Sequence, residues 1–366
     1  MATELNDHSA LRAPPGIPEF REDLFPSPQR IHYGGHPAYR DYVDLRGIAA
    51  RAAALARFSR MFALLLAKRL IQYELIPNEV RSDRSARGRA QLALIGLRNV
   101  FARRRREHRV ASPIACELVQ RGCSVSIAAP DRFAAVELAS QAAFRRLEER
   151  RGRENGKTRE FEDSRLPGDR KSESALYAAV EALFEEAGIM TAAGEYLGRR
   201  ARLIDVNPQI NDRSDGFWRE IFPDRQLETL PRSAYFHRDA SGGDLKAIIY
   251  MTDVGAENGP FGFVLGSHRL RLSLADNLIC ETNDHGLSGT DPEARQAFAL
   301  LPPKLRQKGA FGNDLADDAP ECEEILRCHW PIVGPKGAIV LFDTKGIHRG
   351  GMVEKGERRV ITCVIG

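Results

Sequence analysis

Two stretches in the second half of the chain decide its fold: PRSAYFHRDA at residues 231–240 and GAIVLFDTKGIHRGGMVEKGERRVITCVIG at residues 337–366. In the first stretch His237 and Asp239 stand two positions apart, and side chains at positions i and i+2 of a strand point to the same face. In the second stretch an apolar strand leads through a turn to His348 and then to a last strand. Two histidines and one carboxylate form the ligand set of a non-haem iron(II) centre. The pattern therefore predicts that His237, Asp239 and His348 bind a metal ion.

The chain around these residues favours β-structure. Short runs rich in β-branched and aromatic residues are separated by turns rich in Gly, Pro, Asn and Asp, which is the pattern of antiparallel strands. The predicted strands cover residues 124–128, 202–206, 234–237, 246–253, 261–265, 338–342 and 360–365.

The first half favours helices. Between Ile48 and Leu66 apolar residues recur every three or four positions with arginines between them, and Pro77 ends this helix. Further predicted helices cover 87–106 and 113–121, begin at Pro130, and run from Ser174 to Gly188. Charged side chains dominate residues 148–173, so we expect an exposed loop there.

Three blocks of the sequence resemble the phytanoyl-CoA dioxygenase-like (PhyH) family of Fe(II)/2-oxoglutarate-dependent oxygenases. They are HRD at 237–239, IYMTDVGAENGPFGFVLGSHR at 249–269 and the block from Gly337 onward. The resemblance implies an α+β fold whose core is a double-stranded β-helix, a cupin-like jelly roll with flanking helices. This domain would span residues 111–366, with an insertion at 270–330 over the mouth of the active site. Residues 1–110 would form an N-terminal arm and a helical extension.

The resemblance also implies the site. His237, Asp239 and His348 would hold Fe(II), with 2-oxoglutarate as cosubstrate and O2 as oxidant. The family's 2-oxoglutarate-binding arginine falls on Arg359, with Arg358 as the alternative, because a difference of one residue in the preceding turn would exchange them. A guanidinium suits this task because it binds a carboxylate through two parallel hydrogen bonds.

One position departs from the family pattern. Relatives often have a hydroxylated or aromatic residue two positions after the distal histidine, where it helps to hold 2-oxoglutarate, whereas this chain has Gly350. The second contact of the cosubstrate therefore stays unassigned.

The resemblance implies hydroxylation of an unactivated C–H bond in a small molecule, such as a secondary metabolite, an amino acid or an acyl compound, with release of succinate and CO2. Asp239 stands where halogenating relatives have a small residue, which favours hydroxylation or another oxidation such as desaturation. The alternative is a non-catalytic jelly-roll binding protein that uses the arginine run 103–106 as a docking surface for an anionic partner.

The composition agrees with a globular protein. Of 366 residues 43% are hydrophobic and 28% charged, and the net charge of +4 is too small to indicate a nucleic-acid partner. The longest apolar stretch, 61–76, is interrupted by charged residues, so we expect no membrane span. Six cysteines and an N-terminal stretch without a basic and then an apolar run indicate a reducing, cytoplasmic location. The sequence does not indicate the oligomeric state.

Several motifs are better explained by structure than by chemistry. Cys322, Cys328 and His329 lack the spacing and the fourth ligand of a zinc site. We expect Asn258–Pro260 to form a turn and His268 to make a structural hydrogen bond. The final residues CVIG resemble a prenylation signal, but ITCVIG fits a closing strand better.

Overall fold

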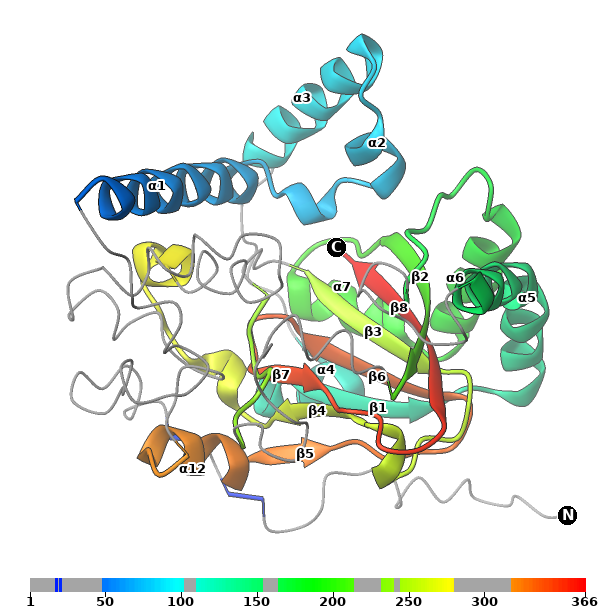
Figure 1. Ribbon diagram of the computed structural model, residues 1–366. Coiled ribbons are helices and arrows are strands. Elements are labelled where there is room, and N and C mark those ends of the chain that lie inside the picture. The colour runs from blue at the N-terminus through cyan, green and yellow to red at the C-terminus, as the bar shows by residue number, and fades with distance from the viewer. Residues whose placement is uncertain are drawn as a thin grey trace, which may run out of the picture.

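Figure 1 shows the computed structural model, in which helices surround two antiparallel sheets. The structure describes residues 17–18, 20–21, 48–101, 110–153, 164–213, 232–239, 244–279 and 317–366. The arginine run 103–106 and most of the 270–330 insertion lie outside these residues. Within the described ranges no helix combines the length and apolar character of a membrane span.

The larger sheet of the described chain has the strand order β1-β6-β3-β8-β2, and every neighbouring pair is antiparallel. Its strands are β1 (Cys123–Ile127), β6 (Ala338–Asp343), β3 (Leu245–Tyr250), β8 (Glu357–Ile365) and β2 (Leu203–Asp212). The smaller sheet has the order β5-β4-β7 and consists of β5 (His329–Pro331), β4 (Phe261–Val264) and β7 (His348–Gly350). Strands β5 and β7 were not predicted, because three residues are too few for a recognisable alternation.

The two faces of the larger sheet bury different sets of residues. Along β8, Ile361 and Cys363 belong to a core shared with the helices. Val360 instead packs with Phe261 and Phe263 of the smaller sheet. This alternation follows from the two-residue period of a strand, and it means that even-numbered side chains of β8 point into the space between the sheets.

Four helices pack on the outer face of the larger sheet (Figure 1): α4 (Pro113–Arg121), α5 (Pro130–Arg153), α6 (Ser174–Glu186) and α7 (Ile189–Leu197). The bounds of α4 agree with the prediction, since the Ser112 side chain caps its start and Gly122, with a φ of 80°, ends it.

The N-terminal helices α1 (Ile48–Leu70), α2 (Asn78–Ser82) and α3 (Ala86–Phe101), with the 3₁₀ helix η4 (Tyr73–Leu75), are joined to the body at β2. The backbone N–H of Asn78 donates to Asp205 at 2.9 Å, and Arg81 forms an ion pair with Asp205 at 2.5 Å. Phe20, which precedes these helices in the chain, is buried in a cluster with residues of helix α12 (Pro320–Arg327).

The predicted strand at 234–237 is wrong. Residues 232–235 form a turn, and Tyr235 has a φ of 63°, in the left-handed region that few side chains adopt. Only His237 takes part in sheet pairing, as an isolated bridge to His348.

The prediction of an exposed loop over 148–173 is wrong at its start, and residues 164–173 form a loop that is partly buried. Helix α5 continues to Arg153, so its last charged residues belong to a helix. At the other end, Ser164 and Leu166 are buried, and their backbones pair with β2: Leu166 donates to Pro208 at 3.0 Å and Ile210 donates to Ser164 at 2.9 Å. Strand β2 offers backbone hydrogen-bonding groups at its edge, and Leu166 is apolar. These contacts order residues 164–166 although charged residues dominate the composition of the segment. Residues 154–163 lie outside the described part.

Two short 3₁₀ helices follow the strands of the second block: η6 (Ala256–Asn258) and η7 (Ser267–Arg269). As predicted, Asn258–Pro260 form a turn, in which Gly259 has a φ of 64° and a Cβ would lie 2.4 Å from the carbonyl oxygen of Gly351. Cys322 and Cys328 are buried in the core and form no disulfide.

His329 lies in the smaller sheet with its ring against Gly262, where a Cβ would lie 1.9 Å from the imidazole Nε2. The ring packs edge-on against Phe236 at a centroid distance of 5.0 Å. Burial, with a smaller contribution from the charge of Arg349, lowers the pKa of His329 to about 3. The folded protein therefore keeps this imidazole neutral.

This burial predicts a pH dependence of stability. Below the unfolded-state pKa of about 6.5 the unfolded chain binds a proton at His329 that the folded chain does not, so stability falls as the pH drops from there toward 3. In His329→Leu this loss is absent. Urea unfolding should show that wild type loses about 2 kcal/mol more than the variant between pH 7.5 and pH 5. Parallel pH profiles would contradict the assignment.

Candidate metal centre

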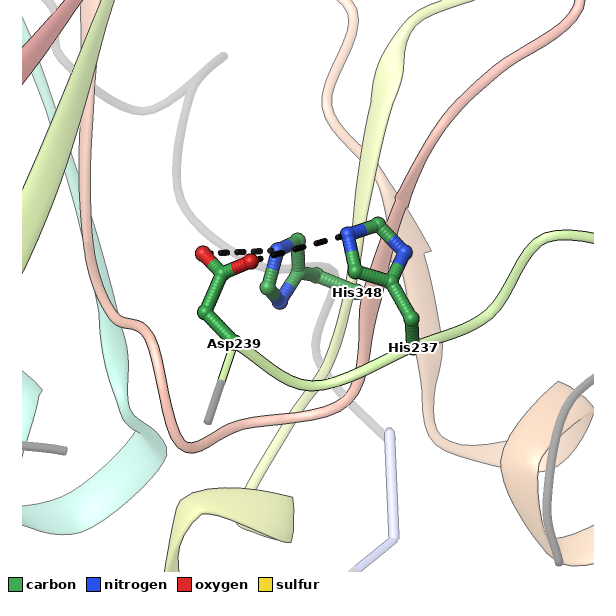
Figure 2. Close-up of side chains that lie close together, drawn as sticks. All are labelled: His237, Asp239 and His348. Carbon is green, nitrogen blue, oxygen red and sulfur yellow. Dashed lines mark ion pairs between the residues drawn. The ribbon is translucent and has the colours of Figure 1, made fainter. Parts of the chain in front are cut away.

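His237, Asp239 and His348 form a cluster in which one ligand atom from each lies within 4.8 Å of the others. Figure 2 shows both imidazole rings and the carboxylate pointing toward one another. The Nε2 of His237 lies 3.8 Å from Oδ1 of Asp239, and the Nε2 of His348 lies 3.6 Å from Oδ2. The structure therefore brings together the three side chains that the sequence pattern singled out.

Backbone hydrogen bonds place these side chains. His237 and His348 exchange two N–H···O bonds, each of 2.9 Å, and the N–H of Asp239 donates to the carbonyl of Thr344 at 2.9 Å. The segment that carries His237 and Asp239 is thus hydrogen-bonded along its length to β7 and to the turn that leads into it. The i and i+2 alignment of His237 and Asp239 comes from this pairing, since the segment is not a regular strand.

Side chains of β4 and η7 fix the turn that precedes His348. A Cβ at Gly346 would lie 2.1 Å from the ring of Phe263, so only glycine fits there. The buried hydroxyl of Ser267 accepts from the N–H of Ile347 at 2.7 Å and donates to the carbonyl of Val264 at 2.6 Å. His268 lies with its Nε2 3.1 Å from the carbonyl of Val119, the structural role expected for it.

Each imidazole is oriented by the carbonyl two residues before it. The Nδ1 of His237 lies 2.9 Å from the oxygen of Tyr235, and the Nδ1 of His348 lies 2.8 Å from that of Gly346. Because a carbonyl can only accept, Nδ1 carries the proton and Nε2 presents its lone pair to the cluster.

The protonation states also suit a metal. Burial lowers the pKa of both histidines, that of His348 to about 3, so both rings are neutral at pH 7. Burial alone would raise the pKa of Asp239, but the charge of Lys246 and the two histidines hold it well below its ordinary value. Two neutral imidazoles and one ionised carboxylate fit a divalent cation without the loss of a proton.

The cluster borders a cavity of about 170 Å³ between the two sheets. Both sheets contribute to its walls, which include Tyr235, Lys246, Tyr250, Phe261, Phe342 and Arg358. The rings of Phe342 and Phe261 also lie against His348, at centroid distances of 4.9 and 5.7 Å.

The two candidate arginines lie on opposite faces of β8. Arg359, preferred from the sequence, points to the outer face of β8, where it pairs with Glu148 at 2.6 Å and with Glu357 at 2.5 Å. Arg358 lines the cavity, is 7% exposed, and has a buried Nη1 without a hydrogen-bond partner among the described residues. Side chains of a strand alternate between its two faces, so a shift of one residue along β8 moves the guanidinium from the cavity to the outer face.

Gly350 lies beside this arginine, since a Cβ there would be 3.4 Å from Nη2 of Arg358. The second contact that a hydroxylated residue would provide is therefore absent at this position. Across the sheet, Asn211 pairs in register with Arg358, lines the same cavity, and has a buried Nδ2 for which the described part offers no hydrogen-bond partner.

Sequence reasoning missed several polar side chains of this cavity, among them Asn211 and Lys246. The Nζ of Lys246 donates to Oδ2 of Asp239 at 2.6 Å. A signal existed, because Lys246 shares the inward-facing set of β3 with Ile248 and Tyr250, whereas lysines on buried strands are rare.

The comparisons with known proteins place the chain near solved structures only. No family model matches it, and no curated protein matches it in sequence. AviO1 from Streptomyces viridochromogenes Tue57 is 15% identical over 69% of this chain and 93% of its own, with a TM-score of 0.37.

Two further structures match at the same level. SnoK from nogalamycin biosynthesis, described as a non-heme alpha ketoglutarate dependent carbocyclase, is 16% identical over 70% of this chain and 83% of its own, with a TM-score of 0.40. EctD from S. alaskensis, solved with bound Fe, is 16% identical over 70% and 76%, with a TM-score of 0.42. Matches of this quality assign no family, so the resemblance to the PhyH family stays a prediction.

We expect His237→Ala and His348→Ala to weaken binding of Fe(II) or Mn(II) at least about 100-fold, because each removes a nitrogen ligand. Anaerobic isothermal titration calorimetry measures this, and circular dichroism checks that both variants stay folded. His268→Ala, which changes a histidine outside the cluster, is the matched control and should bind metal like wild type. Unchanged affinity in either ligand variant would refute the metal site.

Proposed function

We propose that this protein is an Fe(II)- and 2-oxoglutarate-dependent dioxygenase that hydroxylates an unactivated C–H bond of a small molecule. The observation that carries the proposal is the meeting, in one cavity, of the His237, Asp239 and His348 cluster with the buried guanidinium of Arg358, whose Nη1 has no hydrogen-bond partner among the described residues. The first group fits a divalent metal, and the second fits the distal carboxylate of a 2-oxo diacid.

The arrangement of the sheets supports the double-stranded β-helix as the fold. Two antiparallel sheets face each other across an apolar core, and the smaller one carries His348, to which His237 is joined by an isolated bridge. Residues 111–366 would form this oxygenase domain. The helical N-terminal extension packs on it at β2.

In the proposed complex, Fe(II) would be held by the Nε2 atoms of His237 and His348 and by the Asp239 carboxylate. When bound, iron and 2-oxoglutarate supply the oxidative chemistry that consumes O2 and yields succinate, CO2 and an oxidised substrate. Asp239 would supply a carboxylate ligand to the metal, which supports hydroxylation or desaturation over halogenation.

The chain's own residues bind and orient the cosubstrate. Arg358 would receive the distal carboxylate through two parallel hydrogen bonds, and the amide N–H of Asn211 beside it would provide a further donor. This amide offers the second contact that Gly350 cannot provide. The rings of Phe261 and Phe342 keep water from the space around His348.

The first test is spectroscopic. Under anaerobic conditions, Fe(II) and 2-oxoglutarate together should give a weak visible metal-to-ligand charge-transfer band, and Fe(II) with succinate should not, because only the 2-oxo acid chelates through its keto group. Addition of O2 should then release succinate. If the folded protein gives no band, the oxygenase proposal is refuted, and a non-catalytic binding protein becomes the better interpretation.

The second test separates the two arginines. Arg358→Ala should weaken 2-oxoglutarate binding to the metal-loaded protein by about 10- to 100-fold, because a charged hydrogen-bond partner of a buried carboxylate is lost. Arg359→Ala, on the outer face of the same strand, is the matched control and should stay within about twofold of wild type. Titration of the charge-transfer band gives both affinities. If Arg359→Ala lost more 2-oxoglutarate affinity than Arg358→Ala, Arg359 would be the cosubstrate-binding residue.

A further inference from the structure

We propose that Lys246 forms a subsite for a carboxylate of the primary substrate, on the side of the metal ligands that faces away from Arg358. The inference rests on the proposed function, since it takes the Arg358 end of the cavity to be filled by 2-oxoglutarate. It assigns a chemical class to the substrate: a monocarboxylate with an apolar body.

The positions of the two cations along the sheet support this division. Lys246 pairs with Val364 of β8, six residues from Arg358 on the same strand, which corresponds to about 20 Å between backbone positions. The Lys246 ammonium contacts Asp239, and the Arg358 guanidinium lies beside Gly350, two residues after His348. The metal ligands therefore lie between two separate cationic ends of the cavity.

The two ends differ in exposure. The side chain of Lys246 is partly exposed, whereas Arg358 is buried. A cosubstrate that binds first takes the deeper end, and the primary substrate then approaches from the more open one. Lys246 lies where that approach reaches the metal ligands.

The ammonium of Lys246 has charged neighbours of both signs, the acids Asp239 and Asp244 and the cation Arg165. Asp239 accepts its hydrogen bond, so the availability of the ammonium for a substrate depends on that carboxylate.

Metal binding would also weaken the ion pair between Lys246 and its present partner, Asp239. Its Nζ now lies 2.6 Å from Oδ2 of Asp239. Once that carboxylate donates electron density to a divalent metal, it attracts the ammonium less strongly, and the metal itself repels it. A lysine is suited to a new partner here because its flexible stem carries a compact charge with three donors.

The neighbours of Lys246 define the rest of the ligand. Ile248 lies on the same inward face of β3, and Phe342 is the register partner of Lys246 on β6 and lines the same cavity. An aliphatic or aromatic body would pack against these side chains while its carboxylate reaches the ammonium.

The test uses the full chain loaded anaerobically with Mn(II) and saturating 2-oxoglutarate. Isothermal titration calorimetry compares two probes of one shape, 3-phenylpropanoate and 3-phenylpropanamide. Wild type should bind the carboxylate at least about tenfold more tightly than the amide, in line with a charge-assisted hydrogen bond. Lys246→Met should abolish this preference, and Lys246→Arg should retain it. Lys336→Met, which changes a lysine on the surface, is the matched control and should behave as wild type.

Each other outcome counts against the subsite. Equal binding of both probes to wild type, or a preference that persists in Lys246→Met, would overturn it. A loss of 2-oxoglutarate affinity in Lys246→Met would assign the lysine to the cosubstrate, and a loss of Mn(II) affinity with the preference intact would make it a positioning residue for Asp239. If wild type binds neither Mn(II) nor 2-oxoglutarate, the proposed function itself fails, which is a separate result.

Discussion

The pair of backbone hydrogen bonds between His237 and His348 is the contact on which the site depends. It joins two segments that are more than a hundred residues apart in the sequence and that have little regular structure of their own at this point. Neither segment could hold its imidazole in place alone, because residues 232–235 form a turn and β7 is only three residues long. The pairing makes one frame of the two. The carbonyls of Tyr235 and Gly346, each two residues before a histidine, then fix both rings in the same way.

The sequence was informative where a periodic pattern was long enough to read. The predicted bounds of β6 fall within one residue of the strand, whereas β8 begins three residues before its predicted start. The three metal-ligand candidates could be named because their residue types and order match a known pattern. The turn at Asn258–Pro260 and the end of α4 at Gly122 could be read from glycine and proline alone.

The remaining features depend on tertiary contacts. The positive φ of Tyr235 is imposed by the pairing of its neighbours and has no glycine to announce it. Arg358 and Arg359 are indistinguishable as residue types, so only the face of β8 on which each lies separates them. The order of Ser164–Leu166 comes from the edge of β2, which a composition dominated by charge conceals. Lys246 was overlooked because its partner, Asp239, is on a separate segment.

The pairing of residues 164–166 with β2 also bears on how this sheet avoids self-association. A strand at the border of a sheet presents unpaired N–H and C=O groups that can recruit another chain. Here the bonds from Leu166 to Pro208 and from Ile210 to Ser164 use up part of that border, and the joint of the N-terminal helices at Asp205 covers the strand nearby. Since Ser164 and Arg165 also line the cavity, the same short segment shields the sheet and forms a wall of the site. Loss of this segment would therefore harm solubility and ligand binding together.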